Sequence, residues 1–207
     1  MNKNVRSYLV RQPSKYTDKR CLLLQNLGLR SGDMTTEIID IIKMREPDRI
    51  LFGGNKFTDI GFVKELGGVK ELWLQRNLIK DIAPIAGLNE LTVLDLGYNE
   101  IKDFSPIMCL KNLKSLNLSV NNVVDISFIK ELKALELLTL SFNKITNIEA
   151  IKGLSLLREL CLHDNLITDI DSLCYLPNLD TLNIGRNPVT DFTPLADIPK
   201  LRICHSH

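Results

Sequence analysis

Hydrophobic residues recur along most of this chain with a fixed period of 22 residues. Within each unit they occupy positions 1, 3, 8, 11, 14, 17 and 20, and an asparagine stands at position 6. Self-similarity at such a period is typical of a solenoid, in which each unit buries its apolar face only against its neighbours. Seven units begin with a hydrophobic residue at position 1, namely Ile50, Leu72, Leu94, Leu116, Leu138, Leu160 and Leu182.

The spacing inside each unit predicts two short elements. Alternation at positions 1 and 3 indicates a strand, and the spacing of three from position 11 to position 17 favours a single turn of 3₁₀ helix. We expect a capping hydroxyl before a helical proline at Ser105–Pro106 and Thr193–Pro194, with Ser127 and Asp171 in the same slot. Each unit is therefore a strand, a turn, a helical turn and a return, and the strands form a parallel sheet.

Two polar columns are predicted to be structural. The position-6 amide can satisfy backbone groups that the turn would otherwise bury unpaired. A short acceptor at position 10 can bond turn amides, and because it recurs once per unit we interpret it as scaffold rather than as a metal or catalytic array. The columns are Asn55, Asn77, Asn99, Asn121, Asn143, Asn165 and Asn187, and Asp59, Asp81, Asp103, Asp125, Asn147, Asp169 and Asp191.

Composition excludes several classes of partner. The net charge is +1, so no field of one sign would attract nucleic acid or an anionic membrane. Residues 1–8 contain no apolar run of signal-peptide length, and no stretch approaches the roughly 20 apolar residues of a membrane span. The five cysteines show no paired spacing, which favours a reducing compartment. We expect a cytoplasmic or nuclear protein, although secretion without a classical signal would leave the same pattern.

The pattern Leu-x-x-Leu-x-Leu-x-x-Asn-x-Ile-x-Asp-Ile-x-x-Ile-x-x-Leu resembles the 22-residue class of leucine-rich repeats. This class occurs in a regulatory subunit of type-1 protein phosphatase and in bacterial internalins, and the resemblance covers residues 50–203. It implies an α/β repeat solenoid that is curved, with a parallel sheet on the concave face and short 3₁₀ turns on the convex face. The resemblance to the regulatory subunit implies phosphatase binding through aromatic and acidic side chains of the concave face.

The ends of the chain depart from this repeat. Asn26 is assigned to the asparagine slot of a longer first unit, 29 residues before Asn55, and residues 36–43 have a helical pattern. This longer unit resembles the ribonuclease-inhibitor type of repeat. The C-terminal end has no long capping segment after the last repeat, so a weak homodimer through that end is one alternative. We divide the single solenoid domain into an N-terminal cap (1–20), the long first repeat (21–49), seven repeats (50–203) and a short tail (204–207).

The outward positions of the strands are the ones that the repeat does not dictate. An aromatic and aliphatic strip on an otherwise polar face is typical of a protein-binding anchor, whereas single exposed apolar residues are ordinary. Clustering over consecutive units favours the first interpretation. We predict a partner-binding site with apolar anchors Trp73, Tyr98, Phe142 and Val120 and a polar rim of Arg76, Asp95, Glu159 and Asp164.

Cys161 and His163, two residues apart on one strand, are the main competing site. They could begin a zinc site or a nucleophile pair, but neighbouring units offer too few further ligands and no oriented base. We expect Asp164 to pair with Arg186 instead, and we predict no metal, no cofactor and no catalytic residue. The predicted function is a non-enzymatic protein-binding scaffold. The alternative is a type-1-like phosphatase regulator, and a secreted effector or adhesin or a Cys/His metal protein is less favoured.

Overall fold

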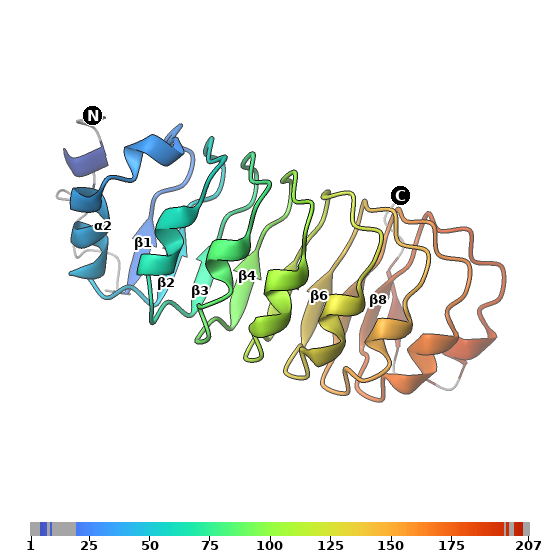
Figure 1. The fold of residues 1–207 in the computed structure, drawn as a ribbon. Coiled ribbons are helices and arrows are strands. Elements are labelled where there is room, and N and C mark those ends of the chain that lie inside the picture. Colours follow the sequence, from blue (N-terminus) through green and yellow to red (C-terminus); the bar gives the residue numbers. More distant parts are fainter. Residues whose placement is uncertain (1–4, 8, 10–19, 197, 199–200, 205–207) are drawn as a thin grey trace.

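The computed structural model describes residues 5–7, 9, 20–196, 198 and 201–204. Nine parallel strands form one sheet in sequence order, and each strand pairs with the next along the chain (Figure 1). This arrangement confirms the predicted solenoid. The strands are β1 (Cys21–Leu23), β2 (Arg49–Leu51), β3 (Glu71–Trp73), β4 (Val93–Asp95), β5 (Ser115–Asn117), β6 (Leu137–Thr139), β7 (Glu159–Cys161), β8 (Thr181–Asn183) and β9 (Arg202–Ile203).

Helical segments lie on the side of the coils opposite the sheet, which is the convex side (Figure 1). The longest is α2 (Thr36–Lys43), which lies in the long first repeat and buries Ile38, Ile39 and Ile42. Residues 5–7 and 9 are also α-helical. The segments that follow β1, apart from α2, are 3₁₀ turns: η1 (Ser31–Asp33), η2 (Gly61–Glu65), η3 (Ala83–Ile85), η4 (Ser105–Cys109), η5 (Ser127–Glu131), η6 (Glu149–Ile151), η7 (Asp171–Tyr175) and η8 (Thr193–Leu195).

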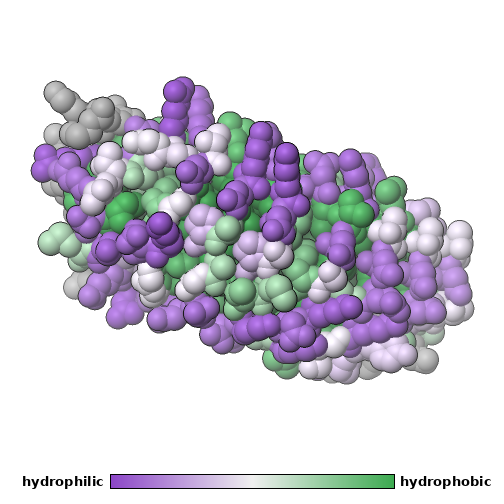
Figure 2. Space-filling model, viewed as in Figure 1, coloured by the Kyte–Doolittle hydropathy of each residue, from purple (hydrophilic) through white to green (hydrophobic). Residues whose placement is uncertain are grey.

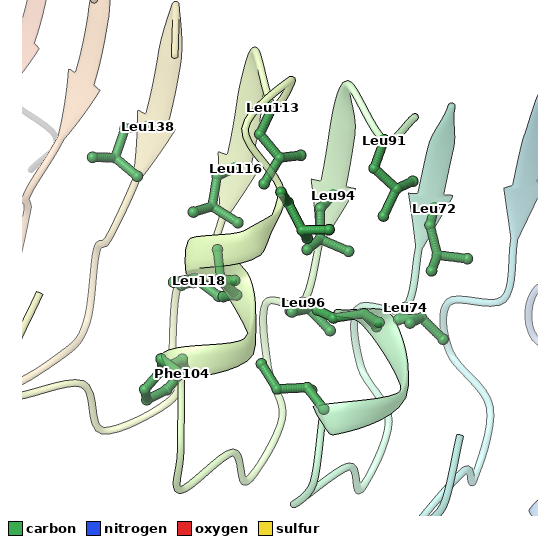
Figure 3. Packing of buried hydrophobic residues seen from close by; sticks show 14 of the residues in the cluster. Leu72, Leu74, Leu91, Leu94, Leu96, Phe104, Leu113, Leu116, Leu118 and Leu138 are labelled. Carbon is green, nitrogen blue, oxygen red and sulfur yellow. The ribbon is translucent and has the colours of Figure 1, made fainter. Parts of the chain in front are cut away.

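The register between strands keeps equivalent leucines side by side. Leu72 of β3 pairs with Leu94 of β4, which pairs in turn with Leu116 of β5. These side chains point into the interior in one row, and the leucines two residues later form a second row (Figure 3). Their exposed fractions are 0–1%, so each coil supplies apolar surface that only its neighbours can cover.

The register corrects the assignment of Asn26. Leu22 pairs with Ile50, which places Asn26 at position 5 rather than in the asparagine slot. Its φ of +58° is the left-handed conformation of the other position-5 residues. Asn26 Oδ1 would lie 1.9 Å from a Cβ built on Gly54, so a larger residue at position 54 would require the Asn26 side chain to move. The amide ladder therefore begins at Asn55, which accepts hydrogen bonds from the N–H groups of Leu27 and Leu29.

The asparagine column forms the predicted ladder between coils. Asn143 Nδ2 donates to the carbonyls of Leu140 in its own coil and Leu118 in the preceding coil, at 2.8 and 3.1 Å. Its Oδ1 accepts the N–H of Val123 from the preceding coil at 2.9 Å. One side chain thus satisfies buried backbone groups of two coils, which explains why an amide, with donors and an acceptor, is needed here.

The position-10 column also has its predicted structural role. Asp81 Oδ1 accepts the N–H of Ala83 at 2.8 Å, and the equivalent bond recurs in every coil, with Asn147 replacing aspartate once. The expectation of a capping hydroxyl was wrong. Ser105 is the first residue of η4, and its N–H and hydroxyl donate to Asp103, so the carboxylate two residues earlier holds the start of the turn. Aspartate reaches these groups because it precedes them by two residues.

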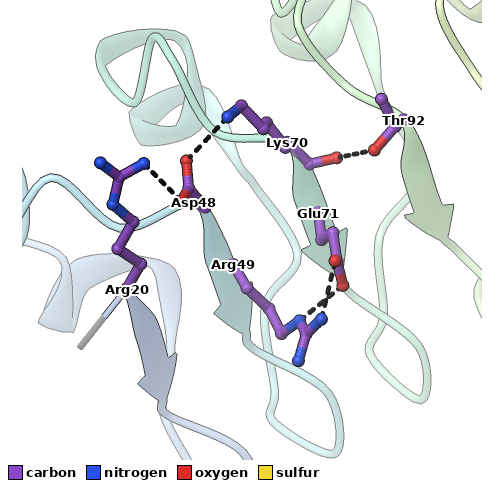
Figure 4. Close-up of polar contacts among 6 residues, drawn as sticks. All are labelled: Arg20, Asp48, Arg49, Lys70, Glu71 and Thr92. Atoms are coloured by element: carbon purple, nitrogen blue, oxygen red, sulfur yellow. Dashed lines mark hydrogen bonds and ion pairs between the residues drawn. The ribbon is translucent and has the colours of Figure 1, made fainter. Parts of the chain in front are cut away.

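Ion pairs join coils along the edge that leads into the strands. Asp48 accepts from Arg20 at 2.8 Å and lies 3.3 Å from Lys70, so it links three successive coils (Figure 4). On the sheet itself Arg49 donates two hydrogen bonds to Glu71, at 2.5 and 2.7 Å. Exposed pairs of this kind contribute about 0–1 kcal/mol each, so the apolar core remains the main source of stability.

The predicted caps lie largely outside the described residues. Of the 1–20 cap, Val5 and Leu9 are buried, and Arg6 pairs with Glu37 of α2 at 2.9 Å. Residues 1–4, 8, 10–19 and 205–207 are not described. Among the described residues, no helix has the length and apolar character needed to cross a bilayer. On the side that carries the 3₁₀ turns, hydrophobic residues are interspersed with hydrophilic ones (Figure 2).

Candidate functional site

The residues after the strands form a row whose backbone is unusual. From Arg76 to Asp164, the position-5 residue of each coil donates its N–H to the position-4 carbonyl of the next coil, as Tyr98 does to Ser119 at 2.8 Å. Each also has a positive φ, a conformation that costs a residue other than glycine about 1–2 kcal/mol. The position-5 row, as we call it, is Arg76 (φ 57°), Tyr98 (57°), Val120 (57°), Phe142 (57°), Asp164 (56°) and Arg186 (54°).

The centre of the position-5 row is apolar and accessible. Tyr98 and Phe142 have exposed fractions of 45% and 46%, and Val120 between them is half-buried. The guanidinium of Arg76 lies 4.5 Å from the centroid of the Tyr98 ring, which fits a cation–π contact and orients the ring. The structure therefore brings five of the predicted site residues, Arg76, Tyr98, Val120, Phe142 and Asp164, into one row across successive coils.

The C-terminal half of the row carries charge. Asp164 lies 3.6 Å from Arg186, which confirms the pairing expected from the sequence. The ring of Phe142 meets His163 edge to face at 5.2 Å. His163 is only 5% exposed, so it supports Phe142 rather than presenting a metal ligand. Burial, as the main cause, raises the pKa of the Cys161 thiol, which disfavours a thiolate nucleophile there.

Potential metal ligands are not grouped elsewhere either: among the described residues, no three His, Cys, Asp or Glu side chains converge on one point. No disulfide joins the five cysteines, all of which lie in described segments.

Three predicted residues lie on the strands themselves. Trp73 ends β3, is half-buried and pairs in register with Asp95. Glu159 begins β7 and is exposed. Asp95 is only 8% exposed, and its Oδ1 accepts from the N–H of Gly97 at 2.9 Å and from Asn117 Nδ2 at 3.0 Å. Burial is the largest influence on Asp95 and raises the pKa of its carboxyl group. The side chain therefore bonds to neighbouring residues of the sheet and offers little surface to a partner.

The floor of the concave face differs from expectation at position 4. The sequence pattern places this position outward with positions 2 and 22, but Ser119, Ser141 and His163 are 8%, 8% and 5% exposed. The next residue in each of these coils has a positive φ, so the chain turns sharply directly after position 4. Position 4 is therefore the base of the face, and position 5 is its accessible border.

Comparison with known proteins fits this geometry. A model described as leucine-rich repeats in two copies matches residues 111–153 and 155–197, and a second leucine-rich-repeat model matches residues 67–123. Internalin C2 of Listeria monocytogenes is 31% identical, with a TM-score of 0.80 over 89% of this chain and 80% of that one. The chain belongs to the leucine-rich-repeat family.

Other leucine-rich-repeat structures are similar over shorter shares of their length. Internalin F of Listeria monocytogenes is 25% identical with a TM-score of 0.67, and the match covers 82% of this chain and 56% of that one. The ectodomain of the plant receptor kinase GASSHO1/SCHENGEN3 from Arabidopsis thaliana shares the fold at 22% identity and a TM-score of 0.67, covering 82% of this chain and 22% of that one. No curated protein matches the chain. Leucine-rich-repeat domains are generally protein-binding scaffolds and typically lack catalytic activity.

The members of the position-5 row can be identified from the sequence, but the strain of their positive φ angles was not predicted. The signal was present, because Gly54 and Asn26 occupy the same position at one end of the leucine-rich-repeat array. Both residue types tolerate a positive φ. Their presence indicates what the turn prefers, and the bulky residues that follow them depart from that preference.

Proposed function

We propose that this leucine-rich-repeat domain is a non-enzymatic scaffold that binds a protein partner along the position-5 row of its concave face. One observation carries the proposal: arginine, tyrosine, valine and phenylalanine occupy consecutive left-handed positions. Glycine or asparagine would fit each position with less strain. Side chains retained against a local cost point to a role beyond the scaffold.

The chemistry of the row suits a partner with an apolar centre and polar flanks. Tyr98, Val120 and Phe142 supply apolar surface on neighbouring coils, roughly 4.8 Å apart. Arg76 lies at one end, and the pair of Asp164 and Arg186 lies at the other. Aromatic anchors with charged residues at the rim match the general anatomy of protein interfaces.

The fold relatives support the same class of function. The GASSHO1/SCHENGEN3 ectodomain forms a complex with CASPARIAN STRIP INTEGRITY FACTOR 2. Solenoids generally bind through their extended concave surfaces. For this chain we infer a protein or peptide partner, with no nucleic acid, membrane or cofactor.

The test removes the two exposed rings of the row. Tyr98→Ala with Phe142→Ala should abolish partner capture from a lysate while the circular dichroism spectrum and thermal midpoint remain close to wild type. The chain offers a matched control on the other side, Tyr175→Ala with Phe192→Ala, because these rings are 57% and 48% exposed. Tyr175 also carries a cation contact, with Lys152 Nζ 5.4 Å from its centroid. If both double variants lose partner capture equally, or if neither loses it, the partner does not bind at the position-5 row.

A narrower role as a subunit of a type-1-like phosphatase uses the same face. Glu159, an exposed acidic residue of the same face, favours it, whereas Glu71 is already held by two hydrogen bonds from Arg49. Copurification with a phosphatase catalytic subunit, sensitive to Glu159→Lys, would support this role. Copurified proteins without any phosphatase would exclude it.

We also propose a cytoplasmic or nuclear location, which fractionation of the source cells tests against the alternative of a secreted effector or adhesin.

A further inference from the structure

Two hydrogen bonds join the turn edges of successive coils. From Leu29 to Ile167, only Ile101 lacks both among the described residues, whereas Ile167 lacks one because Pro188 has no N–H to donate. At position 8, the N–H donates to the asparagine Oδ1 of the next coil, as Ile79 does to Asn99 at 3.1 Å. The position-8 carbonyl accepts the N–H of position 7 in the next coil, as Ile79 does from Glu100 at 2.9 Å. For Ile101 the described part of the chain shows neither bond.

The exception has a local cause at Asn122. Its φ is +58°, and among the described position-7 residues only Gly28 of the first coil, a glycine, also has a positive φ. Asparagine is one of the few residue types that adopt this conformation readily. In this turn the Asn122 N–H does not donate to the Ile101 carbonyl. Asn121 keeps its bonds to Leu96 and Leu118, but its Oδ1 is buried without a hydrogen-bond partner, although the residue is only 1% exposed.

A groove opens where these bonds are missing. It has a volume of about 820 Å³ and lies between the coils that begin at Leu94 and Leu116. The rings of Phe104 and Phe128 stack at 5.5 Å between η4 and η5, so the helical turns stay packed while the turn edge opens. The lining relevant to binding combines Ile101 and Asn121 with the apolar side chains of Phe104, Val124 and Phe128.

We propose that this groove binds an extended peptide segment, one amide of which replaces the missing bonds. Its N–H would donate to Asn121 Oδ1, and its carbonyl would accept the N–H of Ile101. In the other coils these same groups are bonded to an amide side chain or backbone, so an amide is the group that they fit. Val124, which is 59% exposed, offers apolar contact to a side chain of the peptide.

The charges around the groove disfavour an anionic ligand. Lys80 is paired with Glu100 at 3.3 Å, and Asp103 and Asp125 also line the opening. A volume within the range of small-ligand pockets, roughly 300–1,000 Å³, exceeds what a single bridging water needs. The site uses none of the position-5 residues, so it is independent of the proposed concave interface.

The test uses N-acetyl-leucine-N-methylamide, a capped amino acid with two amides and one apolar side chain, titrated into the full chain and followed by ¹H–¹⁵N NMR. The wild type should show saturable shifts centred on the Ile101 and Asn122 amides. Asn122→Lys should weaken binding about tenfold, or about 1.4 kcal/mol, because lysine disfavours the left-handed turn. Lysine occupies position 7 in two other coils, and there the backbone N–H groups of Lys144 and Lys56 donate to the position-8 carbonyl of the preceding coil, which the N–H of Asn122 does not do.

Two further variants separate the groove from other effects. Leu166→Lys adds the same charge at a closed coil and should bind like the wild type. Asn122→Gly keeps the positive φ without the side chain and should stay within about twofold, so the test remains decisive if Asn122→Lys folds poorly. Undiminished binding by Asn122→Lys, or loss of binding by Asn122→Gly, would overturn the proposal. The proposal would also fail if the Ile101 amide showed cross-peaks to water but no saturable shift with the probe, because the groove would then hold water alone.

Discussion

An alanine variant is usually more stable than the glycine variant at the same position. The strain in the position-5 row predicts the opposite order at Val120. We compare Val120→Ala with Val120→Gly, since both remove the isopropyl group and its contacts. The same pair at Ser119 is the matched control. Ser119 is the preceding residue, and its φ is not positive.

The magnitude follows from two opposing terms. A Cβ in the left-handed conformation costs about 1–2 kcal/mol, and Val120 has a φ of +57°. Glycine instead loses about 0.5–1 kcal/mol relative to alanine because its unfolded chain is more flexible. At position 120 the strain term wins, so Val120→Gly should be more stable than Val120→Ala by about 0.5–1 kcal/mol. At position 119 only the entropy term acts, so glycine should be less stable by a similar amount.

Urea unfolding followed by circular dichroism measures all four free energies of unfolding. The predicted result is a change of sign between neighbouring positions, which surface polarity or side-chain volume cannot produce. If alanine is the more stable residue at both positions, the left-handed turn is not strained and the main argument for a functional row fails.

Three further variants test the scaffold. Asn143→Ala should lower the free energy of unfolding by about 3–5 kcal/mol in urea, because it leaves buried backbone groups of two coils unpaired; a loss below about 1 kcal/mol would contradict the ladder. Hydrogen bonds from turn N–H groups and hydroxyls lower the pKa of Asp103, Asp125 and Asp191. Their contribution is therefore complete above the ordinary pKa of 3.8 and is lost as the pH falls below it. The triple Asp→Asn variant should lose less stability than the wild type between pH 5 and pH 3, and parallel losses would refute this. Asp95→Asn should raise the thermal midpoint at pH 7, because burial raises the pKa of this carboxyl and its ionised form opposes folding; a lower midpoint would show that the charge is needed.

The repeat period made the scaffold predictable, because register and burial follow from it. Once Leu72 and Leu94 are equivalent, their pairing, the inward row of leucines and the role of the amide column follow from local geometry. The misplacement of Asn26 shows the limit of this reasoning. Residue type suggested the asparagine slot, but the pairing of Leu22 with Ile50 decides the register, and that pairing depends on how the longer first coil closes.

The candidate sites were less predictable because they depend on backbone angles and on neighbouring coils. Ser119 looks outward in the sequence pattern, and only the fold shows that it is buried. The groove at Asn122 is another example. The doublet of Asn121 and Asn122, and Val124 in a usually polar slot, can be read from the sequence, but residue type alone does not determine φ.

The missing bonds at Ile101 also have a mechanical consequence. Load applied along the solenoid passes from coil to coil through the strands, the core and the amide ladder. Where Ile101 meets Asn121 and Asn122, the ladder lacks bonds that the adjoining coils possess, so this junction resists separation least at its turn edge. Pulled from its two ends, the array should first divide there, into blocks made of residues 20–115 and 116–204, before either block unravels.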